Sequence, residues 1–209
     1  MRTSLVITFA IDGDLRFISH LDTVRLLERA LARAEIPLRY SEGFNPRPRL
    51  SLPLPRSVGV ASDDETLIVE CDEAVTVEDM RTRLSAQLPD GIRLIAVRTM
   101  APRERLVPAR VTYRVAVNGP AEHDVADRAA GLMSRARIDV ERRDAKTGES
   151  HRLDIRPCLL GVRAESGFVE WTQAVLSHGS ARPGEVLAAI GLDADEWLHR
   201  VRRIRVEYA

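Results

Sequence analysis

The chain has 209 residues, with 31 basic and 31 acidic side chains, 44% hydrophobic residues and 4% aromatic residues. These totals describe a globular protein that is long enough for one large domain or two small ones. No stretch approaches the roughly 18 uncharged apolar residues of a membrane helix, and the first apolar run is too short and too soon charged for a signal peptide. The zero net charge excludes a uniformly basic nucleic-acid binder. We therefore expect a cytoplasmic protein with no membrane partner.

The zero net charge hides an uneven distribution along the chain. Residues 1–60 hold nine arginines against six acids, whereas residues 61–100 hold four arginines against nine acids. A binding surface depends on the local sign of the charge rather than on the total. A basic patch within the first 60 residues is therefore compatible with the neutral total.

The two cysteines, Cys71 and Cys158, stand far apart and have no neighbouring cysteine. This spacing fits neither a disulfide framework nor a zinc site, and it cannot hold an iron–sulfur cluster. We expect no metal and no cofactor in this chain.

The first half of the sequence predicts six elements in the order strand, helix, strand, strand, helix, strand. Ser19 and Asp22 form a capping box that opens a helix with an apolar stripe from Leu21 to Ala34. A Pro-rich extended stretch then runs to Pro55, and residues 62–65 are an acidic turn. The remaining predicted strands and helix cover residues 4–11, 66–71, 77–88 and 92–97.

The second half repeats this order after an irregular segment at residues 99–108. Its predicted strands cover residues 111–117 and 204–208, and a helical stripe covers residues 125–136. Two hairpins are expected, one around Lys146 to Gly148 and one at residues 165–167, and short helices begin at Pro183 and after Asp193.

These patterns predict an α+β protein made of two tandem ferredoxin-like βαββαβ sandwiches. The first would occupy residues 1–100, and the second would occupy residues 101–209 and carry an extra β-hairpin.

Three arginines of the first helix, Arg25, Arg29 and Arg33, stand at i, i+4 and i+8 and therefore share one helix face. Guanidinium groups match the geometry of phosphate, so the stripe is a candidate anion-binding surface. The alternative is a solvated face whose arginine stems pack on the sheet while their charged ends stay in water.

The segment after this helix combines two aromatic residues, Tyr40 and Phe44, with Arg47 and Arg49, which alternate with prolines. A residue before proline is held extended, so both arginines project the same way from a stiff strand. Aromatic faces and arginines are what proteins use to bind single-stranded nucleic acid. The alternative is a Pro-rich edge strand with both aromatics in the core.

His20 lies between Ser19 and Asp22, which resembles a catalytic triad in composition. Residues at this spacing around a helix cap do not point at one another as a triad requires, and capping explains Ser19 and Asp22. His20 could contact a phosphate or act as a general base, or it could be a structural or exposed histidine.

The same region resembles the radical SAM-linked protein family, a bacterial domain of unknown function. Relatives are often fused to, or encoded beside, cobalamin-binding radical SAM proteins. The resemblance implies an accessory partner of a radical SAM enzyme that presents an RNA, and it supplies no catalytic residue. It rests on residues 13–22, 25, 29–30, 33–34, 37, 40–41, 43–46 and 48–51.

We therefore expect a non-catalytic accessory protein of a radical SAM enzyme that binds RNA, such as tRNA or rRNA, through a basic face. The alternatives are a protein–protein adaptor without nucleic acid and a metal-independent endoribonuclease that uses His20. The candidate RNA-binding residues are Arg16, His20, Arg25, Arg29, Arg33, Tyr40, Phe44, Asn45, Arg47 and Arg49.

Overall fold

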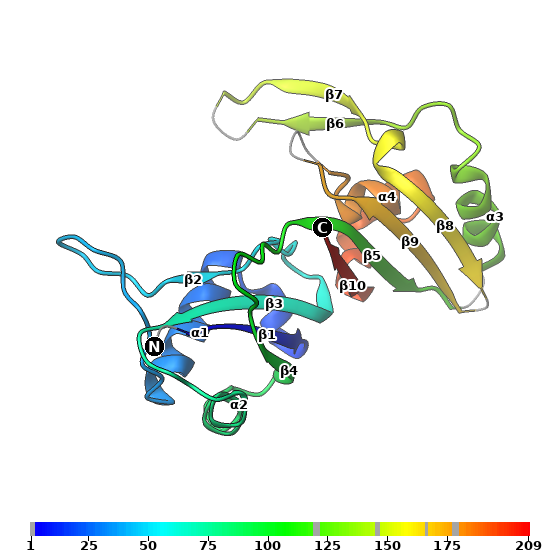
Figure 1. Cartoon of the computed structure of the whole chain (residues 1–209). Coiled ribbons are helices and arrows are strands. Elements are labelled where there is room, and N and C mark those ends of the chain that lie inside the picture. The colour runs from blue at the N-terminus through cyan, green and yellow to red at the C-terminus, as the bar shows by residue number, and fades with distance from the viewer. Residues whose placement is uncertain (1–2, 119–121, 145–146, 166, 177–179) are drawn as a thin grey trace. The chain divides into compact units, whose positions relative to one another are not determined.

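A computed structural model describes residues 3–118, 122–144, 147–165, 167–176 and 180–209. Residue contacts divide the chain into two compact units, which we call unit 1 (residues 1–107 with 209) and unit 2 (residues 108–208). The domain boundary expected at residue 100 lies inside unit 1. Both units combine helices with antiparallel strands (Figure 1), which confirms the α+β class.

Unit 1 contains an antiparallel sheet with the strand order β4-β1-β3, to which β2 is added on β3. The prediction of strand, helix, strand, strand, helix, strand is confirmed as an order of elements, with very different lengths for the two middle strands. The elements are β1 (Thr3–Ile11), the 3-10 helix η1 (Gly13–Phe17), α1 (His20–Arg33), β2 (Leu50–Ser51), β3 (Ala61–Cys71), α2 (Val77–Ser85) and β4 (Ile92–Thr99).

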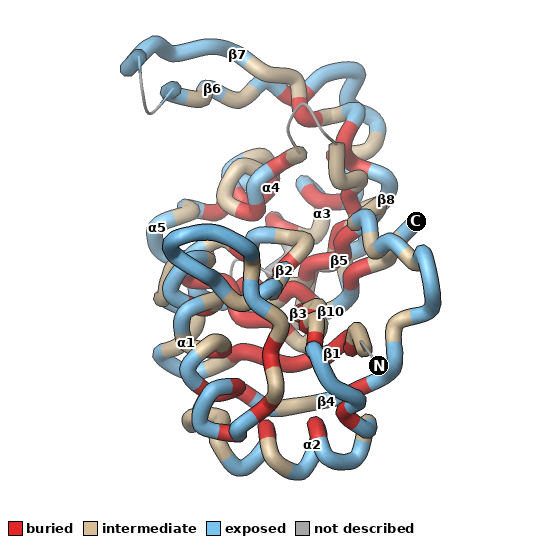
Figure 2. Tube along the Cα trace, turned by 60° about the vertical axis from the view of Figure 1, so that its left-hand side comes forward, coloured by how far each residue is buried: buried red, intermediate tan, exposed pale blue. Residues whose placement is uncertain are grey.

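The core of unit 1 lies between one face of this sheet and the two helices. Alternate residues of a strand point to the same face, so the β-branched and aromatic pattern of β1 places apolar side chains toward the helices. Most of β1 is buried, as the red tube of Figure 2 shows. The buried residues of β1, β3, α1 and α2 that meet there include Leu5, Ile7, Phe9, Leu67, Val69, Leu27, Leu31, Met80 and Leu84.

The predicted cap of α1 is confirmed. The Ser19 hydroxyl accepts a hydrogen bond from the Asp22 backbone amide (3.1 Å) and donates one to the Asp22 carboxylate (2.7 Å). The predicted apolar stripe is wrong at its first position, since Leu21 is 65% exposed. The buried stripe begins instead at Thr23, whose hydroxyl donates to the Ser19 carbonyl (2.9 Å).

The predicted acidic turn at residues 62–65 is also wrong, because these residues belong to β3. Ser62 pairs with Ile11 and Glu65 pairs with Phe9, with an irregularity in register between them. Pairing with a neighbouring strand outweighs the low intrinsic strand preference of acidic residues.

Unit 2 has the strand order β10-β5-β9-β8, again with antiparallel pairs, and a separate ribbon formed by β6 and β7. Its elements are β5 (Pro108–Ala116), α3 (Glu122–Leu132), β6 (Asp139–Arg143), β7 (Ser150–Asp154), η2 (Arg156–Cys158), β8 (Leu159–Glu165), β9 (Phe168–Ala174), α4 (Pro183–Ala189), α5 (Ala194–Trp197), η3 (Leu198–Arg200) and β10 (Val201–Tyr208).

Both predicted hairpins of unit 2 are present as paired strands, β6 with β7 and β8 with β9. Lys146 and Ser166, in the predicted turns, lie outside the described residues. The core contains Trp171 stacked on Tyr113, with 5.4 Å between ring centroids. The buried Arg203 guanidinium lies 5.7 Å from the Tyr113 ring.

Helices long and apolar enough to cross a lipid bilayer are absent from the described residues.

Candidate nucleic-acid interface

A hairpin-like arm, residues 38–51, follows α1 and projects from unit 1 (Figure 1). Its two legs run antiparallel, since the Ser41 amide donates to the Arg47 carbonyl (2.8 Å) and the Arg49 amide donates to the Arg39 carbonyl (2.8 Å). Tyr40 pairs with Pro48 between these two bonds. The predicted Pro-rich extended stretch is therefore folded back on itself.

The base of the arm is fixed to the sheet at one residue of β3, Glu70. The Arg39 amide donates to the Glu70 carbonyl (2.8 Å), and the Glu70 amide donates to the Arg49 carbonyl (3.1 Å). The Glu70 carboxylate also lies 2.8 Å from the Arg39 guanidinium and 3.9 Å from that of Arg49. Both legs are thus held by the same residue, through backbone and side chain.

The tip of the arm is exposed at every residue from Glu42 to Arg47. Phe44 is fully exposed and Tyr40 is about half exposed, so the alternative that placed both aromatics in the core is wrong. Gly43 has a φ of +127°, a conformation that L side chains rarely adopt. The glycine therefore permits the turn that presents the aromatic ring.

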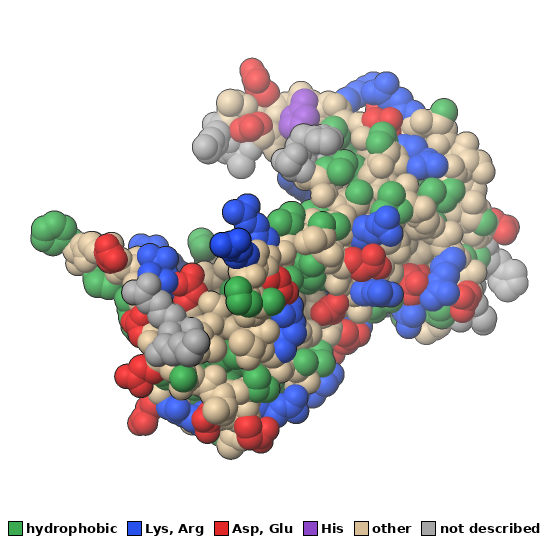
Figure 3. Space-filling model, in the orientation of Figure 1, with side chains coloured by type: hydrophobic (Ala, Val, Ile, Leu, Met, Phe, Trp, Pro, Cys, Tyr) green, Lys and Arg blue, Asp and Glu red, His purple; other side chains and the backbone are tan. Residues whose placement is uncertain are grey.

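The register of the legs separates the side chains into two sets. Directly paired residues share a face, and neighbours along a strand alternate between faces. Arg39, Arg47 and Arg49 therefore share one face of the arm, whereas Tyr40 and Pro48 share the other. In Figure 3, hydrophobic side chains form the outer end of the arm, with charged side chains closer to the body.

The three arginines of α1 are all exposed, but they are not equivalent. Arg25 lies 3.2 Å from the Asp22 carboxylate. Arg33 donates to the Gln87 carbonyl (2.9 Å) and to the Gln87 side chain (3.3 Å), so it joins the end of α1 to the segment after α2. Arg29 is the member of the stripe with no polar side-chain contact among the described residues.

The electrostatic effect of this stripe is visible at the start of α1. The Ser19 hydroxyl, and after it the nearby charges of Arg25 and Arg29, hold the pKa of the Asp22 carboxyl below its ordinary value. The carboxylate therefore stays ionised and offsets part of the positive charge of the stripe.

Arg16, His20 and Asn45 complete the set of predicted site residues. Arg16 forms an ion pair with Asp12 and donates from Nε to the Gly13 carbonyl (3.0 Å), so it fixes the turn before α1. His20 is the first residue of α1 and is half buried, and no hydrogen bond or ion pair is found for it within the described part of the chain. Asn45 lies in the exposed tip.

The arm thus brings together Tyr40, Phe44, Asn45, Arg47 and Arg49, whereas Arg16 and Arg33 have structural contacts elsewhere. Sequence reasoning missed Arg39 and Glu70. An acid that faces two arginines is a usable signal only when the strand pairing is known, and Glu70 is 31 residues from Arg39.

Neither cysteine is placed for nucleophilic chemistry. Both are buried thiols that are not joined in a disulfide, and burial raises the pKa of the Cys71 thiol to about 11, which keeps it protonated. Within the described residues, His, Cys, Asp and Glu side chains form no group of three or more that could hold a metal ion.

Residues 4–184 match the family described as an uncharacterized protein conserved in bacteria (DUF2344). The chain belongs to this family. No curated protein matches the DUF2344 chain. A solved structure, that of an unknown protein from Galdieria sulphuraria, is similar at 13% identity and a TM-score of 0.27, over 100% of this chain and 99% of that chain. These similarities assign no activity to the DUF2344 chain.

Proposed function

We propose that this protein binds single-stranded RNA, such as an unpaired part of a tRNA or rRNA, through the arm and without catalysing a reaction. The observation that carries the proposal is the fully exposed Phe44, held at the tip of a backbone-paired arm next to the exposed Arg47. A large aromatic ring in water is unfavourable for the free protein. A nucleobase stacked on the ring would remove that cost.

The arm has two properties that suit this ligand. Stacking of a base on an aromatic side chain contributes about 1–3 kcal/mol per base and tolerates any sequence. The arginines on one face supply charge for phosphates. Because Glu70 fixes both legs, little backbone entropy remains to be lost on binding.

We propose that only some of the predicted RNA-binding residues touch RNA directly. Arg16 forms an ion pair with Asp12, and the Arg33 guanidinium is held in place by hydrogen bonds to the neutral Gln87. The role of these two side chains would be to position the surface. The residues proposed to contact RNA directly are Arg25, Arg29, Tyr40, Phe44, Asn45, Arg47 and Arg49.

The test is binding of a fluorescent eight-nucleotide RNA, followed by anisotropy at several salt concentrations. The double variant Phe44→Ala/Arg47→Ala should bind at least about ten-fold more weakly, because it loses one stacked base and one phosphate contact. Its plot of log affinity against log salt should also flatten by about one unit. Arg81→Ala, at an exposed arginine of α2, is the matched control. Equal affinity of the double variant and the control would refute the proposal.

The accessory role in a radical SAM system is a further part of the proposal, supported by the sequence resemblance alone. In that role the bound RNA would be presented to the partner enzyme. If RNA connects the two proteins, nuclease treatment should release the partner from the purified complex.

A protein–protein adaptor is the second candidate, and one observation favours it. Phe17, Leu21 and Val58 are each at least half exposed. The Gly59 amide donates to the Arg16 carbonyl (2.8 Å), which brings the loop around Val58 beside Phe17. An adaptor would retain its partner after nuclease treatment, and Leu21→Asp would release it.

An endoribonuclease that uses His20 is the third candidate. Capping accounts for Ser19 and Asp22, and no described contact orients the imidazole for catalysis. We therefore expect RNA to stay intact with the protein in the presence of EDTA. Cleavage that disappears in His20→Ala would establish the nuclease instead.

We infer that each unit is a ferredoxin-like sandwich. Support comes from the recurring element order and from the matching strand orders, β4-β1-β3-β2 in unit 1 and β10-β5-β9-β8 in unit 2. In this interpretation, the β6–β7 ribbon is an insertion after the first helix of the second sandwich.

A further inference from the structure

The sheet of unit 2 has one face that does not contribute to the Trp171 core. Val169 and Trp171 of β9 are buried, so Glu170 and Thr172, which alternate with them, lie on the opposite face. The register places Arg163 and Arg114 on either side of Glu170, and Gly161 and Thr112 on either side of Thr172. Two rows of paired residues therefore cross β8, β9 and β5 on this face.

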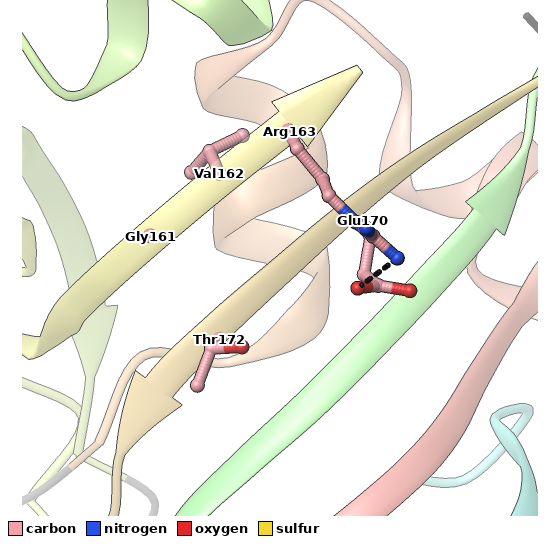
Figure 4. A pocket seen from close by; sticks show the side chains of 5 residues that line it. All are labelled: Gly161, Val162, Arg163, Glu170 and Thr172. Carbon is pink, nitrogen blue, oxygen red and sulfur yellow. Dashed lines mark ion pairs between the residues drawn. The ribbon is translucent and has the colours of Figure 1, made fainter. Parts of the chain in front are cut away.

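A hollow of about 210 Å³ lies on this face, lined by Gly161, Val162, Arg163, Glu170 and Thr172. Figure 4 shows Arg163 reaching over β9 to Glu170, with Thr172 further along the same strand and Gly161 leaving β8 bare. The hollow is smaller than the roughly 300 Å³ at which pockets for whole small molecules begin. It therefore suits one part of a larger ligand.

One wall of the hollow is formed by Arg163 and Glu170, and Arg114 of β5 lies directly beside Glu170. Glu170, which is only 12% exposed, accepts from Arg114 Nη2 (2.8 Å) and from Arg163 Nη2 (2.9 Å). The Arg114 guanidinium also lies over the Phe168 ring, 4.4 Å from its centroid. Arg163 also pairs with Glu165 (3.3 Å). Two guanidiniums therefore face two carboxylates, so they are held in place and this wall carries no net charge.

The floor of the hollow carries hydroxyl groups. The Thr172 hydroxyl lies 2.9 Å from that of Thr112, which pairs with it across the strands. Hydroxyls both donate and accept hydrogen bonds, so this floor can bind the polar atoms of a sugar. The neighbouring guanidinium planes, whose side chains remain about half exposed, can stack on a flat base.

We propose that this hollow seats one unpaired nucleotide of an RNA strand, with the base stacked on the arginine wall and the ribose on the threonine floor. The inference deepens the proposed function, because it rests on RNA being the ligand. It gives unit 2 an RNA contact of its own, independent of the arm. The preset orientation of the guanidiniums lowers the entropic cost of binding.

The test uses the full chain and Gly161→Val, which fills the hollow. A Cβ added at Gly161 meets nothing within 4 Å, and a β-branched residue suits a strand, so the variant should fold with an unchanged or higher Tm. The second variant, Thr172→Val, removes the floor hydroxyl at nearly constant volume. The readout is photo-crosslinking of an eight-nucleotide RNA containing 4-thiouridine, located by mass spectrometry of the peptides.

In the wild type we expect crosslinks in residues 159–174 and in the arm. Gly161→Val should reduce the crosslinks in residues 159–174 at least five-fold and leave those in the arm unchanged. Thr172→Val should reduce the crosslinks in residues 159–174 by a smaller factor. Phe44→Ala/Arg47→Ala should show the converse pattern.

Three results would overturn the inference. Crosslinks in the arm alone would contradict a nucleotide site in the hollow but would agree with RNA binding through the arm. The absence of any crosslink would contradict both the nucleotide site and the proposed RNA binding. Binding of free adenosine monophosphate that Gly161→Val abolishes, without RNA crosslinks in residues 159–174, would contradict the assignment to RNA.

Discussion

Two hairpins of the molecule, the arm in unit 1 and the β6–β7 ribbon in unit 2, each contain one arginine whose surroundings are opposite to those of the other. In the ribbon, Arg142 is 10% exposed and donates to both carboxylate oxygens of Glu185 in α4 (2.7 and 2.8 Å). Its Nη2 also donates to the Ser180 carbonyl (2.6 Å). In the arm, the Arg47 side chain is exposed and makes no polar contact with the described residues.

This difference shows that the number of arginines in the sequence is a poor guide to binding. Of the 31 basic residues, 30 are arginine and one is lysine, Lys146. Several hold the fold together, as the buried Arg56 does by donating to the Arg16 carbonyl (2.7 Å). Only an arginine whose charge is not already committed can bind a phosphate at full strength. The contacts therefore separate candidate binding residues from structural ones.

The largest loss of stability should come from replacing Arg142 of the ribbon. Arg142→Ala leaves the Glu185 carboxylate almost buried and without its guanidinium partner. Breaking a buried ion pair from one side costs about 3 kcal/mol or more, so the free energy of unfolding should fall by about that amount in urea titrations.

Arg143→Ala is the control for this prediction, since Arg143 is exposed and donates to Gly148 of the same ribbon (3.0 Å). Its effect should stay within about 0.5 kcal/mol. Equal losses in the two variants would show that the ribbon does not depend on Arg142.

A smaller effect is expected at the base of the arm. Glu70→Gln removes the charge that faces Arg39 and Arg49 but keeps the backbone bonds. Because this pair is partly exposed, the free energy of unfolding should fall by less than about 1 kcal/mol. Hydrogen exchange of the Arg39 and Arg49 amides should accelerate, while that of the β1 amides should not. Unchanged exchange at the base would mean that the backbone alone holds the arm.

The two hairpins also show which features of the fold local sequence patterns can predict. The alternation of β1 and the capping of α1 by Ser19 depend on neighbours in sequence, and both are confirmed. The contact of Arg33 with Gln87 joins residues 54 positions apart, and no local pattern encodes it. The arm needs the pairing of Tyr40 with Pro48 and the register against Glu70.

Composition predicted the kinds of residue at the candidate site but not their exposure. The Arg-Pro alternation and the two aromatics were visible in the sequence, and both a core and a surface position fitted them. The hollow of unit 2 was invisible, because Gly161 and Thr172 become neighbours only through the pairing of β8 with β9.

The smallest change in stability is expected at an ion pair near the end of unit 1, between Arg98 and Glu104. Arg98 is more exposed than Arg142, but unlike Arg47 it has a carboxylate partner. Glu104 accepts from Arg98 Nη2 (2.6 Å) and Nη1 (3.0 Å) and from the Ala101 amide (2.8 Å). The hydrogen bond from Arg98, followed by that from the Ala101 amide, lowers the pKa of Glu104 to about 2. In the unfolded chain this carboxyl titrates near its ordinary value of about 4.3.

The folded state therefore binds this proton less readily than the unfolded state, so the contribution of Glu104 to stability is complete above the unfolded pKa. It should be lost progressively as the pH falls from about 4.5 to about 2. Urea midpoints of the wild type and Glu104→Gln, measured from pH 6 to pH 2, should differ slightly at pH 6 and converge at the acid end. A difference that stays constant across this range would show that the carboxylate charge is not what Arg98 recognises. In that case the exposed pair would belong with Arg47, among the arginines whose charge the fold does not use.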